Sequence, residues 1–181
     1  MIYVFLAEGF EEIESLATVD FLRRCYIEVV TVGVGSKEVT GAHNITVQAD
    51  TVESLIEKSD KLQGIVLPGG MPGTLNLQKS DLVNELLDYS VEKGLVIGAI
   101  CAAPSILGEK GLLKGKKATC FPGFEDKLLG AEVTGAYAEV DGNIVTGKGA
   151  GDTIDFARKI AEKFVGAEKA LEVKQSMQCK M

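Results

Sequence analysis

The chain has 181 residues, of which 46% are hydrophobic and 25% are charged, and its formal net charge is −7. This length is enough for one domain with a buried core, so we expect a single domain over residues 1–181. Acidic and basic residues are interspersed and form no basic face, which argues against nucleic acid as a partner.

In the first half of the chain, nearly continuous apolar runs alternate with a helical pattern. Ile13, Ala17 and Phe21 recur at helical spacing, with acidic residues in the first turn of that segment and two arginines in the last. The predicted elements are a strand at 2–7, a helix at 11–25, a strand at 27–35, and a small hairpin within 37–50 that turns around 41–44.

The second half continues this alternation. Pro104 fits a helix only in its first turn, where the missing N–H breaks no intrahelical bond. Asp152 is placed to cap the last predicted helix. The elements are a strand at 64–70, a helix at 82–94, a strand at 95–100, a helix at 102–113, a β segment at 116–121, a hairpin within 136–151 turning at 141–143, and a helix at 152–166.

Alternating strands and helices, with strands that are apolar throughout, predict an α/β fold with a mostly parallel sheet covered by helices on both faces. Ligands of such sheets bind beyond the carboxyl ends of the strands. Three loop segments, AEGFEE, PGGMPG and CAAP, each begin where a predicted strand ends. We therefore expect them to lie together along one edge of the sheet.

The N-terminal segment has no basic leader and its apolar run is too short for a signal peptide. No apolar stretch approaches the ~20 residues needed to cross a bilayer, so we expect a cytoplasmic protein without a membrane partner. The four cysteines lie far apart, with no CxxC pair and no metal-ligand spacing. They are expected to be free thiols, and no metal is expected.

Cys101 lies between a strand and a helix, where unpaired N–H groups and the helix dipole stabilise a thiolate. Its small neighbours, Ala99, Ala102 and Ala103, would let it project from a sharp turn, as a nucleophile does at an elbow. The alternative is that Cys101 only fills space, since cysteine is among the most buried residue types. The spacing alone leaves both interpretations open.

Gly69 and Gly70 follow a predicted strand, where their backbone can approach a ligand closely and point N–H groups at an oxyanion. Glycine pairs also form ordinary turns. Glu14 shares a helix face with Ala17 and Phe21 and should lean toward the sheet edge. A partly buried carboxyl there has a raised pKa and can donate a hydrogen bond or move protons, whereas a solvated Glu14 is the alternative.

His43 is the only histidine and lies in the small hairpin, where a histidine is usually just part of the polar surface. A Cys-His-Asp hydrolase would require His43 to reach Cys101, and nothing in the sequence demands this. Cys120 lies on a strand-like segment and is expected to be a core residue rather than a partner for an oxidised Cys101.

Five segments in order, AEGFEEIE, VLPGG, GAICAAP, ATCFPGFEDKL and VTGKGAGDTIDFA, resemble the ThiJ/PfpI superfamily. Within it they are most similar to the subfamily of the Parkinson-disease protein deglycase and bacterial YajL, over residues 1 to about 170. The resemblance implies a flavodoxin-like three-layer α/β/α sandwich that forms a homodimer and needs no cofactor.

The resemblance also implies the roles of five residues. Cys101 would be the oxidisable nucleophile, and Glu14 the protonated carboxyl that lowers its pKa. Gly69 and Gly70, with the N–H of Ala102, would bind an oxyanion. The substrates would be small α-oxoaldehydes such as glyoxal and methylglyoxal, or glycated protein or nucleotide groups.

Three positions depart from patterns found in the superfamily. Ala102 follows the cysteine where protease-like or amidotransferase-like relatives have histidine, which disfavours those activities. Phe121 stands where some members have histidine, so a histidine-assisted mechanism is in doubt. His43 takes the approximate place of an arginine of close relatives, which gives it an accessory role in handling an anion or a proton.

Two functions fit the same cysteine. In the first, the protein is a deglycase or glyoxalase-type enzyme of carbonyl and oxidative stress defence. In the second, it is a non-catalytic redox sensor or stress chaperone whose Cys101 is oxidised to a sulfinic acid.

Overall fold

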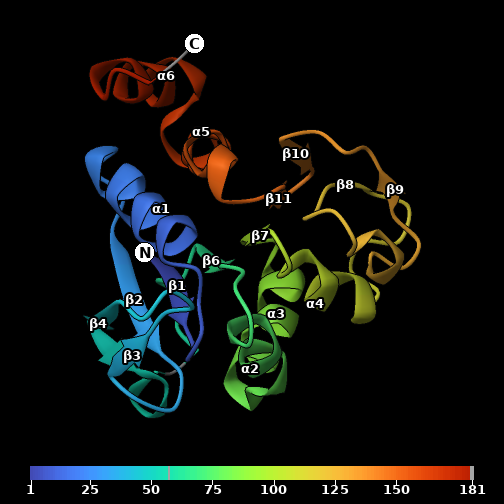
Figure 1. Cartoon of the computed structure of the whole chain (residues 1–181). Coiled ribbons are helices and arrows are strands. Elements are labelled where there is room, and N and C mark those ends of the chain that lie inside the picture. Colours follow the sequence, from blue (N-terminus) through green and yellow to red (C-terminus); the bar gives the residue numbers. More distant parts are fainter. Residues whose placement is uncertain (57, 180–181) are drawn as a thin grey trace.

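The computed structural model describes residues 1–56 and 58–179 and contains a seven-stranded sheet with helices on both faces (Figure 1). Six strands run parallel, and the edge strand β10 pairs antiparallel with β11. The predicted α/β/α sandwich with a mostly parallel sheet is therefore confirmed. In sheet order, the strands are β10 (Ala138–Asp141), β11 (Ile144–Gly147), β7 (Val96–Ile100), β6 (Gly64–Leu67), β1 (Ile2–Leu6), β2 (Val29–Gly33) and β5 (Thr51–Val52).

The helices give the sheet a separate hydrophobic core on each face. One core contains Val4 of β1 and packs against α1, α5 and α6, whereas the other contains Phe5 and packs against α2, α3 and α4. Successive residues of a strand point to opposite faces, which explains why the strands are apolar throughout. The helices are α1 (Glu12–Arg24), α2 (Gly73–Lys79), α3 (Asp81–Lys93), α4 (Pro104–Glu109), α5 (Thr153–Val165) and α6 (Ala167–Ser176).

Two short sheets lie outside the main one. One of them is the predicted hairpin within 37–50, which is confirmed as β3 (Glu38–Thr40) and β4 (Thr46–Gln48). The hairpin predicted within 136–151 is confirmed as β10 and β11 at the edge of the main sheet. The predicted β segment at 116–121 forms only β8 (Lys117–Ala118), which pairs in parallel with β9 (Glu132–Val133). Short 3₁₀ turns occupy Glu53–Leu55, Glu125–Lys127 and Ala150–Asp152.

Several predicted elements are longer than the observed ones. The strand predicted to reach residue 70 ends at Leu67, because Pro68 follows and has no N–H for the ladder. The helix predicted at 102–113 is α-helical only at Pro104–Glu109, and Gly111 beyond it has a left-handed backbone (φ +74°). The sequence patterns missed α2 and α6.

Asp152 does not cap the last long helix as predicted. It stands at the N-cap position, but its side chain makes no capping hydrogen bond. A 3₁₀ turn precedes the helix instead, and the Thr153 hydroxyl donates a hydrogen bond to the Ala150 carbonyl. The C-terminal segment, for which the sequence predicted no helix, forms α6, where Lys174 is buried and its Nζ donates to Asp155 Oδ1 at 2.8 Å.

The fold brings the three glycine- and cysteine-containing loops together as expected. β1, β6 and β7 are adjacent parallel strands, so their carboxyl ends meet at one edge of the sheet. Glu8, Pro68 and Cys101 follow these ends within two residues. A hydrogen bond from Glu11 N to Gly69 O (3.0 Å) joins the first loop to the second.

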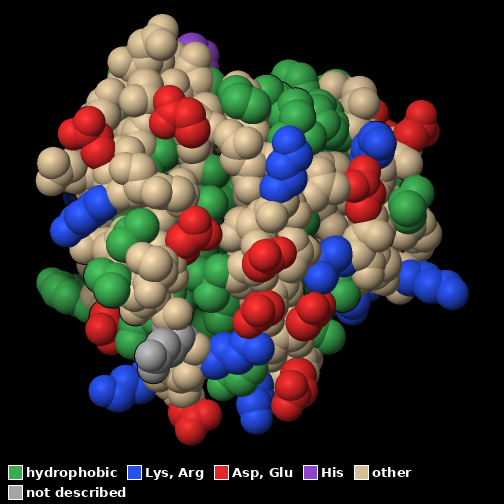
Figure 2. All heavy atoms as spheres, turned by 90° about the horizontal axis from the view of Figure 1, so that it is seen from below, with side chains coloured by type: hydrophobic (Ala, Val, Ile, Leu, Met, Phe, Trp, Pro, Cys, Tyr) green, Lys and Arg blue, Asp and Glu red, His purple; other side chains and the backbone are tan. Residues whose placement is uncertain are grey.

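On the face shown in Figure 2, lysine and arginine side chains are scattered among acidic ones rather than gathered into a continuous basic surface. This agrees with the formal net charge of −7. Among the residues that the structure describes, no helix combines the length and the hydropathy of a membrane span.

Candidate active site around Cys101

Cys101 occupies a sharp, strained turn between β7 and α4. Its φ is +64°, a left-handed conformation that costs a non-glycine residue about 1–3 kcal/mol and that the surrounding structure must impose. Hydrogen bonds hold both of its backbone groups: its N–H donates to Gly147 O (2.9 Å), and its carbonyl accepts from Phe121 N (2.8 Å). The turn is therefore the elbow expected from the sequence, and its side chain is partly exposed.

Glu14 is buried beside Cys101. Only 1% of its surface is exposed, which excludes the solvated alternative, and its Oε2 accepts a hydrogen bond from Gly69 N at 2.9 Å. The carboxyl also interacts with the Cys101 thiol. Glu11 sets the position of this turn of α1, because its side chain caps the helix by accepting from Glu14 N (2.7 Å).

The carboxyl of Glu14 and the thiol of Cys101 titrate as a pair. Burial raises the pKa of Glu14 to about 7 despite hydrogen bonds from Cys101 and Gly69. Burial, followed by the negative charge of a Glu14 carboxylate, raises the pKa of Cys101 to about 12, and the N–H groups of Ala102 and Gly70 offset only part of this. The sequence led us to expect a lowered pKa for the thiol, and the structure gives the opposite direction.

A thiolate remains accessible through the proton that the pair shares. In acid, Glu14 and Cys101 each carry a proton. The first of these protons dissociates near pH 7, and the second dissociates only near pH 12. Between these values one proton remains. When Glu14 holds it, the sulfur is an anion that accepts hydrogen bonds from a neutral carboxyl and from the N–H groups of Gly70 and Ala102.

The glycine pair serves two different purposes. Gly69 N–H is bound to Glu14, so it positions the carboxyl, while the N–H groups of Gly70 and Ala102 face the sulfur. A β-carbon on Gly69 would lie 2.7 Å from Cys101 Cβ and 2.7 Å from Glu14 Oε2. Gly70 has a φ of +89°, which only glycine adopts readily. The close approach therefore requires glycine at both positions.

Gly69→Ala is expected to separate Glu14 from Cys101. The added methyl group has no room between the two side chains, and overpacking of this kind costs about 1–3 kcal/mol. Thermal unfolding should show this loss, and alkylation of Cys101 at pH 7.5 should lose its dependence on Glu14. Gly151→Ala is the matched control, because a β-carbon there meets no atom within 4 Å. Unchanged stability of Gly69→Ala would contradict the packing described here.

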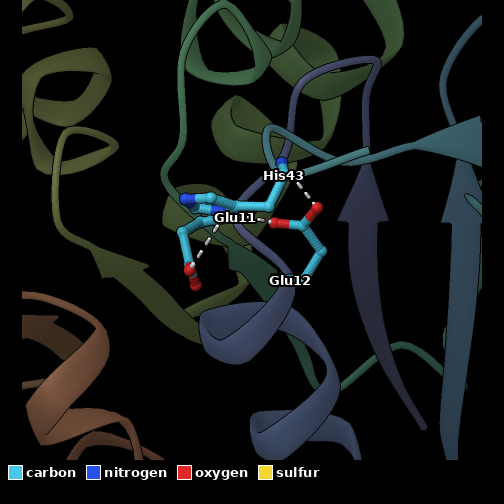
Figure 3. Close-up of side chains that lie close together, drawn as sticks. All are labelled: Glu11, Glu12 and His43. Atoms are coloured by element: carbon cyan, nitrogen blue, oxygen red, sulfur yellow. Dashed lines mark hydrogen bonds and ion pairs between the residues drawn. The ribbon is translucent and has the colours of Figure 1, made fainter. Parts of the chain in front are cut away.

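Glu12 ties the small hairpin to α1 (Figure 3). Its side chain is buried and accepts hydrogen bonds from His43 N (2.7 Å), His43 Nδ1 (2.8 Å) and Ile45 N (3.4 Å). Burial alone would raise the pKa of Glu12, but these hydrogen bonds outweigh it and lower the pKa below its usual value. The hydrogen bond and negative charge of Glu12 raise the pKa of His43.

His43 thus contacts Glu12, and its Nδ1 lies 3.9 Å from Glu11 Oε1, while 69% of its side chain is exposed. Within residues 1–56 and 58–179 no hydrogen bond or ion pair joins it to Cys101. The sequence presented Glu11 and Glu12 only as acids at a helix end. Their capping and anchoring roles depend on the hairpin folding back, which the local pattern does not reveal.

Glu12→Gln is expected to lower the free energy of unfolding by about 1–3 kcal/mol at pH 7, because a buried acceptor of three hydrogen bonds is altered. A carboxyl with a lowered folded pKa stabilises above its unfolded pKa, and this contribution disappears as the pH falls through the folded pKa. The difference from wild type should therefore vanish in acid. Chemical denaturation at several pH values tests this, with the exposed Glu38→Gln as control. A difference that stays the same at every pH from 7 down into acid would contradict it.

Cys120 and Phe121 lie beside the elbow without entering it. Cys120 is buried in the second core, and burial, followed by the charge of Glu125, raises the pKa of its thiol to about 11. This agrees with a core residue. Phe121 is 47% exposed, and its ring lies over Gly149, where a β-carbon would come within 3.3 Å.

The amino-acid sequence is similar to that of known proteins over most of its length. The DJ-1/PfpI family model matches residues 1–163. The chain is 37% identical over 177 residues to Protein dj-1beta of Drosophila melanogaster, covering 96% of this chain and 94% of that protein. It is 34% identical over 168 residues to the glutathione-independent glyoxalase DJR-1.2 of Caenorhabditis elegans, covering 90% and 87%.

The fold is also similar to that of one of these relatives. The crystal structure of Drosophila melanogaster DJ-1beta superposes with a TM-score of 0.92 at 35% identity and covers 99% of this chain and 98% of that one. The chain spans only 40% of the length of DJ-1 homolog B of Arabidopsis thaliana, to which it is 38% identical.

Proposed function

The chain belongs to the DJ-1/PfpI family, and from this premise we propose that it is a cysteine-dependent enzyme acting on glyoxal, methylglyoxal or their adducts. The observation that carries the proposal is the buried Glu14 carboxyl held by Gly69 N–H against the strained Cys101. A Caenorhabditis elegans relative named a glutathione-independent glyoxalase supports the same chemistry. We propose that it acts in the cytoplasm without a cofactor.

The first step is addition of the thiolate to an aldehyde. Cys101 Sγ forms a bond to the aldehyde carbon while the π electrons of the carbonyl move to its oxygen. The N–H groups of Gly70 and Ala102, which face the sulfur, stabilise the developing oxyanion. Glu14 then supplies the proton that it retained, and a neutral hemithioacetal results.

The second step moves hydrogen within the substrate. The Glu14 carboxylate removes the proton from the carbon bonded to sulfur, and the electron pair forms an enediol with the neighbouring carbonyl carbon, whose oxygen is protonated. Protonation of that carbon, together with loss of the proton from the hydroxyl on the sulfur-bearing carbon, gives a lactoyl thioester of Cys101. Water hydrolyses the thioester to lactate and free thiol. One carbon is oxidised and its neighbour reduced, so no external oxidant or reductant is consumed.

Product analysis tests the proposal. The protein is incubated with methylglyoxal in the absence of glutathione, and the products are followed by proton NMR. Lactate formed catalytically, with one aldehyde consumed for each lactate, is the expected result. Loss of aldehyde limited to one equivalent per Cys101, without lactate, would contradict catalysis of this reaction.

A redox sensor or stress chaperone is the second candidate, because a sulfinic acid on Cys101 could accept a hydrogen bond from protonated Glu14. Peroxide would be the oxidant, and two oxygen atoms would be added to sulfur. Intact-mass measurement under graded peroxide distinguishes the candidates. Selective gain of two oxygens at Cys101 in a protein that makes no lactate favours the sensor.

We also propose a homodimer formed through α1 and the small hairpin. Ile13 (57% exposed), Leu16 (38%) and Ile45 (54%) are large apolar side chains at the surface, and Ile13 and Ile45 line one cavity of about 320 Å³. Burying them against a second copy would remove apolar area from water.

Ile13→Lys is expected to convert the dimer to a folded monomer, because a charge would be buried at the centre of that contact. Sedimentation velocity at micromolar concentration measures the change. Leu55→Lys, at another apolar position that is 74% exposed, is the control. A monomeric wild-type protein, or an Ile13→Lys dimer of equal stability, would contradict this interface.

A further inference from the structure

A second cavity lies at the end of the sheet opposite to Cys101. Its volume is about 380 Å³, which is within the range of small-molecule sites. The start of β7 borders it, so the five residues of β7 separate it from Cys101 by about 15 Å at ~3.3 Å per residue. The walls are mainly apolar and are formed by Val91, Leu95, Ile97, Leu112 and Ile144.

Ser90 of α3 lines this cavity and carries a hydroxyl without a hydrogen-bond partner in the structure. The residue is fully buried. A serine inside a helix can bond the carbonyl four residues earlier, but this one does not. A buried hydroxyl without a partner is uncommon in proteins and calls for an explanation. A ligand oxygen reaching it could both donate and accept a hydrogen bond.

The charges around the cavity favour a neutral ligand. Lys116 lies at its border, but its Nζ is already paired with Asp141 Oδ1 at 3.2 Å. Gly94, at the carboxyl end of α3, and Gly111, just beyond α4, also line the cavity. The carboxyl end of a helix carries partial negative charge, which disfavours an anion. The hydroxyl group of a neutral ligand can donate a hydrogen bond toward this partial negative charge.

We propose that this cavity binds a neutral, mainly apolar alcohol or phenol, whose hydrocarbon part lies against Leu95, Leu112 and Ile144 and whose hydroxyl group pairs with Ser90. The site is separate from Cys101 and does not depend on the proposed chemistry there. Its signature is a preference for a hydroxylated ring over the same ring without the hydroxyl or with a charge.

Titration of the ¹⁵N-labelled full chain with phenol, toluene and benzoate tests the proposal. Phenol is expected to give saturable NMR shifts at the amides of Ser90, Leu95 and Ile97. Toluene should bind the same site at least fivefold more weakly, and benzoate more weakly still. Absence of saturable shifts at these residues, or tighter binding of benzoate than phenol, would overturn it.

Two variants identify the contacts. Ser90→Ala should weaken phenol at least fivefold and leave toluene unchanged, and it should not destabilise the fold, because the hydroxyl has no partner to lose. Val91→Trp, at a half-exposed position of the wall, should block both probes. Equal phenol affinity for Ser90→Ala and wild type would refute the role of Ser90.

Discussion

Cys101→Ser is expected to abolish lactate formation from methylglyoxal, with a fall in rate of at least about a thousandfold, corresponding to about 4 kcal/mol of barrier. Serine fits the same elbow, but its hydroxyl ionises far less readily than a thiol and cannot use the proton that Cys101 shares with Glu14. The rate is measured by proton NMR at pH 7.5 under substrate excess.

Cys120→Ala and Cys179→Ser are the controls, because one thiol is buried in the core and the other lies in the C-terminal segment. Both variants should retain the wild-type rate. Undiminished turnover by Cys101→Ser would remove the nucleophile from the proposal, whereas a loss in Cys120→Ala would give Cys120 a role that its core position does not suggest.

Glu14→Gln is expected to change the pH profile of Cys101 alkylation by iodoacetamide. In the wild type the rate should rise through about pH 7, where the pair loses its first proton, and then level off until the second proton leaves near pH 12. The variant has no shared proton, and burial still disfavours its thiolate. Because the charge of Glu14 raises the pKa of the Cys101 thiol, removing that charge should let the variant's rate keep rising above pH 7 and exceed the wild-type rate at least about tenfold at pH 9.

The stability of Glu14→Gln should shift in the direction set by the same titration. A carboxyl with a folded pKa near 7 stabilises the protein below its unfolded pKa of about 4.3, and this contribution is lost as the pH rises through 7. The full difference is about 4 kcal/mol, from roughly 2.7 pKa units at about 1.36 kcal/mol each. The stability of the wild type should fall from pH 5 to pH 8 more than that of the variant.

A wild-type alkylation rate that rises tenfold per pH unit from 6 to 10 would refute the shared proton.

Much of the fold followed from local patterns, because strands buried on both faces are apolar throughout. The alternation of these runs with helices predicted the parallel sheet, and the sheet in turn predicted that Cys101 and Gly69 meet at one edge. The helix face of Glu14 allowed a buried or a solvated carboxyl, and its 1% exposure in the structure decides between them. The short α2 was missed because its Pro-Gly start is typical of a turn, and α6 because burial of Lys174 depends on Asp155 of another helix.

The electrostatics of the site could not be predicted in the same way. Spacing placed Cys101 near N–H groups but gave no measure of how far burial and Glu14 would oppose a negative sulfur. Likewise, Glu12 resembles any acid in a first helical turn until the hairpin supplies His43 and Ile45. Both effects arise from contacts between segments that are distant in the chain.

The first turn of α1 places neighbouring glutamates in three unlike surroundings, and a deep mutational scan should resolve them. Glu11 caps the helix, so aspartate, serine or threonine should replace it with little harm. Glu12 holds the hairpin, so substitutions there should lower the amount of folded protein in an abundance assay. Glu14 faces the sulfur, so the near-isosteric Glu14→Gln should accumulate at neutral pH yet fail an aldehyde-survival screen.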